Sequence, residues 1–396
     1  MNQKLSLSKK LTVTVLFVAV FIVGLDSFII SPLLPTIAKS FNSDVSHVGV
    51  GITMYTLFYA FGAALVAPFL EKVSQKVIIT IGFSLFTLAN FLGGTAFNLT
   101  TFFIYQSLAG FGAGLVVPNV YAYVGRNFSQ EHVGKIIGIV MSALSLSIAV
   151  GALIGSFAAK FQNWNWIFYC YAFFSVITLI LIIRFTEKDE AAKIQTSNYL
   201  SHYANIFTNP LPMYGLIVVL FSIYGFYTTY TYLGNYIEKS LNIPVGSTVF
   251  VVYGLSNFVS SFIGGWIGKK LGSKKTILIA GIVSCLSYFS IGLTGNTLGT
   301  FVIGLAVLGF SRGLSALQLT AYNSTIIPES RVTMMSLNNT FIYLGTTLGS
   351  TIGGILYDKC SFSSLTVISI GFTIAAFVLA EIAIVQKERK LESQSN

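Results

Sequence analysis

Long apolar segments decide what this chain can fold into. Twelve of them, each about 20 to 27 residues long, are separated by linkers that are mostly short and polar. About 20 apolar residues suffice for a helix to cross a bilayer. Only 9% of the 396 residues are charged, against about 25% in soluble domains. We therefore expect an all-α membrane protein with twelve transmembrane helices. The segments lie at about 11–34, 47–70, 77–96, 100–124, 135–159, 166–186, 210–234, 247–267, 276–295, 299–325, 333–357 and 365–386.

The basic residues indicate how these segments are oriented. The net charge of +10 is spread over the linkers, which argues against nucleic-acid binding. Of the 23 Lys and Arg residues, 18 lie in the N-terminus, every second linker and the C-terminus, and four lie in the alternate linkers. Basic residues favour the cytoplasmic side. Both termini and the middle linker, 187–209, are therefore expected there. The end of this linker is aromatic and amphipathic, which favours the membrane surface.

The two halves of the chain resemble each other at an offset of 198 residues. At this offset Gly151 aligns with Gly349, and Gly155 aligns with Gly353. Two parallel six-helix repeats around a midplane cavity are typical of transporters that rock between two states. We expect two pseudo-symmetric six-helix halves around a central cavity. The predicted divisions are an N-terminal half (1–186), a cytoplasmic linker (187–209) and a C-terminal half (210–396).

Asp26 is a lone acid in the first apolar segment. A bare carboxylate at membrane depth costs several kcal/mol, so such residues are usually functional. It lies 15 residues into its segment, or about 22 Å at 1.5 Å per residue. We predict a role in proton coupling or in recognition of a substrate cation. The alternative is a structural acid whose oxygens are satisfied by the hydroxyls of Ser27 or Ser31.

Arg312 is the second charge inside an apolar segment. It lies 14 residues into its span, about 21 Å from the outer face, whereas Asp26 lies about 22 Å from the inner face. The two charges are therefore expected about two helical turns or less apart in depth. The guanidinium fork suits a carboxylate, which predicts an anion site. The alternative is a structural tether to backbone carbonyls or to Asp26. The half-repeat places Gly114 opposite Arg312, and this asymmetry favours a substrate role.

Aromatic residues and glycines supply further candidates. Tyr224, Phe226 and Tyr227 lie deep in the seventh segment, where they could form a stacking or cation–π wall, with plain packing as the alternative. The aligned glycines most simply allow close helix contact, and a sliding interface during rocking is their functional interpretation. Three scattered cysteines and three scattered histidines predict no metal site. No nucleophile–base set indicates an enzyme.

Several motifs resemble the major facilitator superfamily, and within it the twelve-span drug:proton antiporters. GLDSFIISPLLPTIAKSF at 24–41 is similar to the first-span signature, in which an acid precedes a proline-containing exit. SIAVGALIGS at 147–156 resembles the fifth-span antiporter motif, with Ala152 where the family usually has proline. NWNWIF at 163–168 resembles the entry to span six, and the segment 328–354 resembles span eleven.

The resemblance also assigns gating and cavity residues. APFLEKVSQK at 67–76 stands where the family has its conformational latch, and it keeps Glu71, Lys72 and Lys76 but lacks both glycines. Spans one, four, seven and ten line the cavity in this family. Gln106 stands where span four usually carries an arginine, and with Asn119 it is a substrate-binding candidate.

Together these features predict a proton-driven exporter in the cytoplasmic membrane of a bacterium. Export against an inward proton gradient requires proton and substrate to exclude one another, as a cation competing for Asp26 would. A zwitterion or amphipathic cation fits, with any carboxylate at Arg312. Drug-like compounds and carboxylate-bearing metabolites, such as a metal-chelating metallophore, meet this description. We expect a monomer in the lipid bilayer, no nucleic-acid partner and no cofactor besides the proton gradient. The alternatives are a proton-coupled nutrient importer and a non-transporting membrane receptor.

Overall fold

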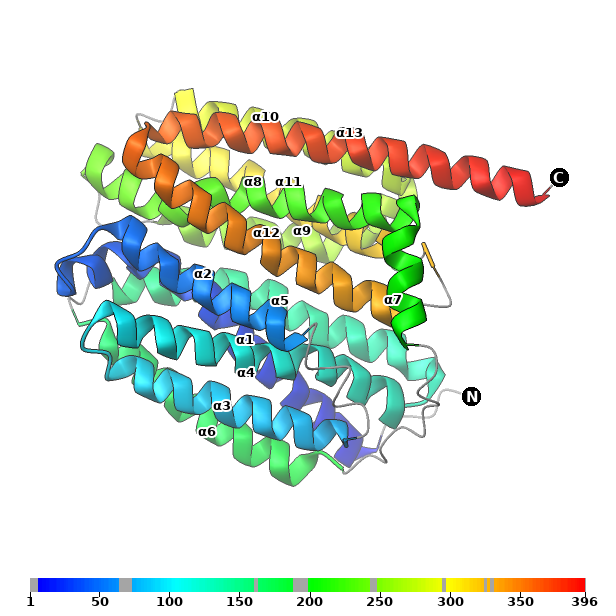
Figure 1. Ribbon diagram of the computed structural model, residues 1–396, viewed down its shortest axis with the longest axis horizontal. Helices are drawn as coiled ribbons and strands as arrows, with labels where there is room; N and C mark the ends of the chain where they lie inside the picture. Colours follow the sequence, from blue (N-terminus) through cyan, green and yellow to red (C-terminus); the bar gives the residue numbers. More distant parts are fainter. Residues whose placement is uncertain are drawn as a thin grey trace.

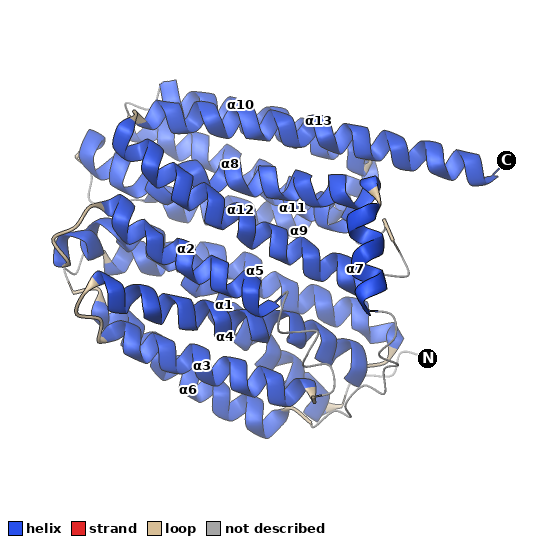
Figure 2. Cartoon of the chain, in the orientation of Figure 1, coloured by secondary structure: helices blue, strands red, loops and turns tan. Residues whose placement is uncertain are grey.

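Helices account for the whole of the regular structure that can be described. The computed structural model describes residues 6–63, 73–159, 163–187, 199–242, 248–293, 297–323, 326–327 and 331–395. Within these ranges there are thirteen helices and no strand (Figure 2). The N-terminal half contains α1 (Leu7–Ser40), α2 (Val45–Phe61), α3 (Gln75–Gly94), α4 (Leu99–Asn127), α5 (Gln130–Ala158) and α6 (Asn165–Phe185). The remainder contains α7 (Tyr199–Thr208), α8 (Pro210–Leu241), α9 (Thr248–Leu271), α10 (Ser273–Leu293), α11 (Leu298–Asn323), α12 (Arg331–Lys359) and α13 (Phe362–Ser395).

Each predicted apolar segment coincides with a long helix. Eight helices in the described part are long and apolar enough to cross a membrane, and the other long helices have 17 to 29 residues. Part of the second predicted segment, at 64–70, lies outside the described residues. The prediction of an all-α membrane fold is confirmed.

The long helices lie side by side and define two ends of the bundle (Figure 1). Both termini and the short helix α7 lie at one end, which we call the terminal end; we call the other the far end. Helix α7 runs across the terminal end, and its Ile206 is buried against Leu216 of α8 and against Met334 and Leu337 of α12. The amphipathic end of the middle linker thus covers part of the C-terminal half.

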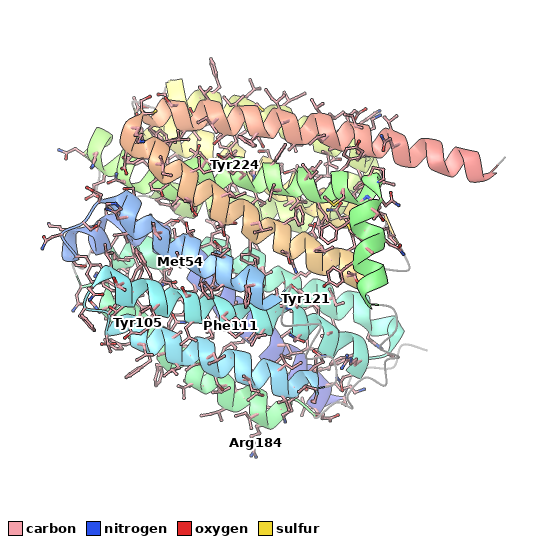
Figure 3. The ribbon with its side chains drawn as sticks, viewed as in Figure 1. Met54, Tyr105, Phe111, Tyr121, Arg184 and Tyr224 are labelled. Atoms are coloured by element: carbon pink, nitrogen blue, oxygen red, sulfur yellow. The ribbon has the colours of Figure 1, made fainter. Side chains whose placement is uncertain are left out.

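Large apolar side chains cover the outside of the bundle (Figure 3). Phe173, Ile180, Leu286 and Ile303 each have 58 to 67% of their surface exposed. A soluble monomer rarely exposes a continuous apolar surface of this extent. The bundle therefore presents a surface suited to lipid.

Glycines set the closest helix contacts, and they do so in the same way in both halves. Gly110 of α4 lies against the Tyr55 carbonyl of α2, and Gly309 of α11 lies against the Tyr253 carbonyl of α9. Small residues let helix backbones approach in this manner. The same correspondence joins Gly114 with Gly313, Gly151 with Gly349, and Gly155 with Gly353.

These contacts correct the predicted partner of Arg312 in the repeat. Gly114 lies against the Tyr59 carbonyl and Gly313 against the Asn257 carbonyl, so the two glycines occupy matching positions. Arg312 therefore corresponds to Ala113. The prediction of Gly114 was wrong by one residue, because α4 and α11 match at an offset of 199 rather than 198.

A single methyl group at Gly110 should destabilise the bundle. The added Cβ of Gly110→Ala would collide with the Tyr55 carbonyl, which is backbone and cannot move aside. Overpacking of this kind typically costs about 1–3 kcal/mol. We expect a lower midpoint of thermal unfolding in detergent. The control is Gly125→Ala, also in α4, where nothing lies within 4 Å of the added Cβ. Equal midpoints for the two variants would contradict this packing account.

Candidate functional site

Helix α2 of the N-terminal half meets α12 of the C-terminal half through a row of hydroxyl groups. Thr53 Oγ1 lies 3.0 Å from Ser350 Oγ and 2.8 Å from Thr351 Oγ1. Thr56 Oγ1 lies 2.8 Å from Thr347 Oγ1. We call these five residues the hydroxyl ladder. Interhelical hydrogen bonds in membranes are each worth about 0.6 to 2 kcal/mol, so the ladder can hold the halves together and still open.

The row of contacts continues with two stacked tyrosines. The rings of Tyr59 and Tyr343 lie 3.6 Å apart between centroids, at 25° to each other, and their hydroxyls form a side-chain hydrogen bond. Tyr59 is one helical turn beyond Thr56 toward the terminal end, because α2 runs from the far end. This pair therefore lies on the terminal side of the hydroxyl ladder.

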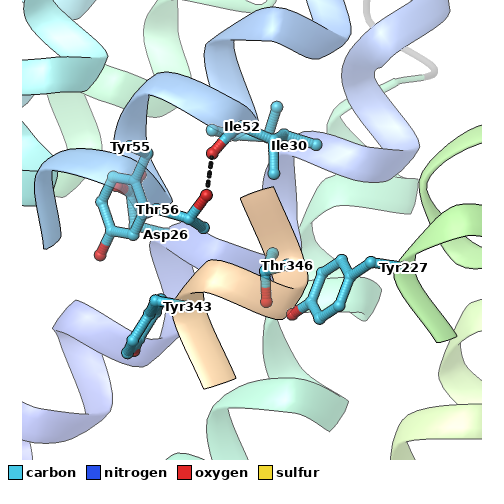
Figure 4. A pocket seen from close by; sticks show the side chains of 8 residues that line it. All are labelled: Asp26, Ile30, Ile52, Tyr55, Thr56, Tyr227, Tyr343 and Thr346. Atoms are coloured by element: carbon cyan, nitrogen blue, oxygen red, sulfur yellow. Dashed lines mark hydrogen bonds between the residues drawn. The ribbon is translucent and has the colours of Figure 1, made fainter. Parts of the chain in front are cut away.

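A pocket lies beside these contacts, between the two halves (Figure 4). The pocket is small in this state of the protein, with a cavity volume of about 10 Å³, which is room for about one water molecule. Its walls come from α1 and α2 of the N-terminal half and from α8 and α12 of the C-terminal half. The lining residues are Asp26, Ile30, Ile52, Tyr55, Thr56, Tyr227, Tyr343 and Thr346. Because both halves form the walls, relative motion of the halves must change the pocket.

Asp26 is the acid of this pocket. It is 1% exposed, and neither carboxyl oxygen has a hydrogen-bond partner among the described residues. The Ser31 hydroxyl is also unpaired within this part of the chain, so it does not satisfy Asp26, and the Ser27 side chain lies outside the description. A buried carboxyl without donors is costly when ionised. A proton or a cationic ligand would offset that cost.

Two predicted glycines fix the position of the helix that carries Asp26. Gly151 of α5 lies against the Leu25 carbonyl, and Gly155 lies against the Ile29 carbonyl. These contacts hold α1 close to α5 on both sides of Asp26. Gly349 and Gly353 do the same for α12 and α8, against the carbonyls of Tyr224 and Thr228. All four glycines therefore act within a half, and their role in gating stays a prediction.

The predicted aromatic wall is split by the structure. Tyr227 lines the Asp26 pocket (Figure 4). Its hydroxyl forms a side-chain hydrogen bond with Thr346. Tyr224 instead packs 4.1 Å from the ring of Phe372 on α13. Phe226 stacks 5.2 Å from the ring of Tyr253, inside the C-terminal half. Tyr224 and Phe226 thus lie outside the pocket lining, and their substrate role stays a prediction.

The polar candidates of α4 also lie outside the pocket lining. Gln106 is buried, and its Oε1 has no partner within the described ranges. The amide nitrogen of Asn119 donates to the Leu115 carbonyl at 2.7 Å. With its amide turned to suit both neighbours, Gln75 donates to Asn119 Oδ1 and accepts from Arg126 at 3.1 Å. Asn119 thus belongs to a polar network within the N-terminal half, and its substrate role stays a prediction.

Arg312 lies in the aromatic interior of the C-terminal half. Its Nη1 donates to the Ser222 carbonyl at 2.9 Å and to Ser222 Oγ at 2.5 Å. Its guanidinium carbon lies 5.0 Å from the centroid of the Phe226 ring. Among the described residues Arg312 forms no ion pair with Asp26 or another carboxylate. The predicted tether to a backbone carbonyl is present, and the tether to Asp26 is not.

The predicted latch is described only in part. Glu71 and Lys72 lie outside the described residues. Lys76 Nζ donates to the carbonyls of Ile183 at 2.8 Å and Thr186 at 2.6 Å, at the C-terminal end of α6. A cation there suits the negative end of the helix dipole. This contact joins α3 to α6 within one half.

The pocket residues of α2 and α12 were not predicted from the sequence. On α2, Tyr55 and Thr56 come three and four residues after Ile52. On α12, Thr346 comes three residues after Tyr343. Each set therefore lies on one helix face. The available signal was the density of hydroxyl groups in the segment 340–351, which contains five Thr or Ser residues and Tyr343 in an otherwise apolar span.

Fold and site together define a class of protein. A lipid-facing helical bundle with a buried acid between two halves is the architecture of a membrane transporter. A profile of the major facilitator superfamily matches residues 16–297 and 215–396. The chain belongs to the major facilitator superfamily.

Two relatives and one solved structure are similar to this chain over nearly its whole length. The uncharacterized MFS-type transporter YwfA of Bacillus subtilis is 29% identical over 394 residues, which cover 96% of this chain and 93% of YwfA. The quinolone resistance protein NorA of Staphylococcus aureus is 23% identical, over 96% of this chain and 98% of NorA. The solved structure of a D-xylose-proton symporter superimposes with a TM-score of 0.78 at 15% identity, over 94% of this chain and 97% of the symporter. The last comparison concerns the fold alone.

Proposed function

We propose that this transporter exports small amphipathic cations or zwitterions in exchange for protons. The observation that carries the proposal is Asp26, a buried carboxyl group without a partner among the described residues, in a pocket walled by both halves. Such a group can be neutralised by a proton or by a substrate cation, but not by both at once. Binding of one therefore displaces the other, which is the requirement for antiport.

The pocket also links occupancy to motion of the halves. Thr56 lines the pocket and is a member of the hydroxyl ladder, and Tyr343 lines it and stacks on Tyr59. A ligand that fills the space beside Asp26 acts directly on contacts that hold α2 to α12. Release toward the far end requires the ladder to open, and entry from the terminal end requires the two tyrosines to part.

Several features support the direction of transport and its setting. The distribution of Lys and Arg favours a cytoplasmic terminal end. A relative named for quinolone resistance favours export. The relatives named above come from bacteria, which favours a bacterial cytoplasmic membrane. We propose a monomer that uses the proton gradient and no further cofactor. Carboxylate-bearing metabolites, metallophores among them, share the same chemistry.

Energised membrane vesicles test this proposal. Everted vesicles that acidify their interior should accumulate ethidium, a permanent amphipathic cation, and should release it when nigericin collapses the pH gradient. Vesicles from cells without the protein are the control. Right-side-out vesicles should exclude ethidium. Accumulation in right-side-out vesicles driven by an inward proton gradient would instead establish symport, and so contradict export.

A further inference from the structure

Arg312 carries a buried charge that the Asp26 pocket does not use. It is 7% exposed and does not line that pocket. Its Nη1 is engaged by Ser222, but its Nε has no hydrogen-bond partner within the described residues. No described carboxylate pairs with it. An arginine stays protonated in proteins, so this site holds a positive charge without a described counter-ion.

Three tyrosines interact with this charge. Arg312 interacts electrostatically with Tyr227, Tyr253 and Tyr288, and a side-chain hydrogen bond joins it to Tyr253. The hydroxyl of Tyr288, which is 1% exposed, has no partner among the described residues. A buried donor left unpaired costs about 1–3 kcal/mol. Arg312 Nε and the Tyr288 hydroxyl belong to side chains that interact with each other, and both lack a hydrogen-bond partner among the described residues. They point to a missing acceptor.

We infer that Arg312 and Tyr288 form a carboxylate-binding subsite, which Tyr253 completes. A carboxylate is planar and can accept two parallel hydrogen bonds from an arginine fork. The Phe226 ring beneath the guanidinium and the Ser222 bonds fix the plane of that fork. A single arginine balances one negative charge, which suits a carboxylate better than a doubly charged phosphate.

Tyr227 connects this subsite to the pocket. It lines the Asp26 pocket and also interacts electrostatically with Arg312. Its hydrogen bond to Thr346 of α12 fixes the orientation of its hydroxyl. This step rests on the proposed function: a zwitterion would place its ammonium at Asp26 and its carboxylate at Arg312, past Tyr227. A substrate cation without a carboxylate would use Asp26 alone.

The test is carboxylate binding by the purified full-length protein in detergent, without any gradient. Benzoate and benzamide have nearly the same shape and differ in charge. We expect benzoate to raise the midpoint of thermal unfolding by about 2 °C or more at saturation, and benzamide to raise it much less. Equal shifts for the two compounds would overturn the subsite. A larger shift with inorganic phosphate than with benzoate would overturn its assignment to carboxylates.

Matched variants locate the binding. Arg312→Lys keeps the charge but loses the fork, and should weaken benzoate about tenfold. Tyr288→Phe removes one hydroxyl, keeps the ring, and should reduce benzoate affinity severalfold. Tyr171→Phe is its control, because the Tyr171 hydroxyl is also buried and unpaired among the described residues but lies in the other half. Full benzoate binding by both Arg312→Lys and Tyr288→Phe would refute the assignment.

Asp26→Asn separates this inference from the proposed function. The substitution should leave the preference for benzoate over benzamide intact, since Asp26 is not part of the subsite. In the parent protein, failure of proton-coupled export with an intact benzoate preference would remove the proposed function and keep the subsite. Intact ethidium export with no benzoate preference would do the reverse.

Discussion

Asp26→Asn should abolish the accumulation of ethidium in energised everted vesicles while the protein remains folded. The amide cannot bind and release a proton, so the proton gradient can no longer drive transport through this position. We expect at least a tenfold loss of accumulation. The midpoint of thermal unfolding should stay the same or rise, because the substitution removes a buried charge that lacks a partner among the described residues.

Two comparisons separate a coupling residue from a structural one. Asp26→Glu keeps a titratable carboxyl and should retain part of the accumulation. Exchange of labelled for unlabelled ethidium across reconstituted vesicles needs no gradient, so it can survive in Asp26→Asn. If Asp26→Asn concentrated ethidium like the parent, Asp26 would be structural and the proposed mechanism would be wrong.

A disulfide across the hydroxyl ladder should stop transport. Thr53 and Ser350 belong to opposite halves, and their hydroxyls lie 3.0 Å apart. The double substitution Thr53→Cys and Ser350→Cys therefore places two thiols within reach of each other. Oxidation should reduce ethidium transport by at least tenfold, and a reducing agent should restore it. The reason is that release toward the far end requires α2 and α12 to separate.

A matched pair within one half controls for the chemistry of cross-linking. Thr229 of α8 and Ser369 of α13 have their hydroxyls 2.6 Å apart, and both helices belong to the C-terminal half. The oxidised pair Thr229→Cys and Ser369→Cys should leave transport largely unchanged. Full transport by the oxidised Thr53–Ser350 pair, with the cross-link shown by mass spectrometry, would exclude opening at the ladder.

The sequence was sufficient to predict the fold, for a physical reason. An apolar run of spanning length has few alternatives to a membrane helix, so each predicted segment coincides with a helix. The aligned glycines likewise predicted close helix contacts, and Gly151 and Gly349 make equivalent ones, against the carbonyls of Leu25 and Tyr224. The exact alignment of helices between the two halves was harder to predict from the sequence. A shift of one residue between α4 and α11 moved the partner of Arg312 from Gly114 to Ala113.

The site was predictable only where a residue was chemically exceptional. Asp26 is rare at membrane depth, and the structure places it in the pocket. Tyr227 also lines the pocket. Its neighbour Phe226 packs against Tyr253 inside the C-terminal half, since successive helix residues are about 100° apart. Tyr224 is three residues from Tyr227 and so lies on nearly the same face, but its ring packs against Phe372 of α13. Thr56 and Tyr343 were missed because hydroxyl and aromatic groups are common in membrane helices. Only the approach of α2 to α12 gives them a role.

Competition between a proton and a cation for Asp26 is the central claim, and proton release on ligand binding tests it most directly. Ethidium is added to the purified protein in weakly buffered detergent solution near neutral pH, with a pH indicator present. The parent should release protons as ethidium binds, up to one per molecule, and Asp26→Asn should release none. Ethidium that binds to the parent, as its fluorescence would report, without releasing any proton would contradict the account.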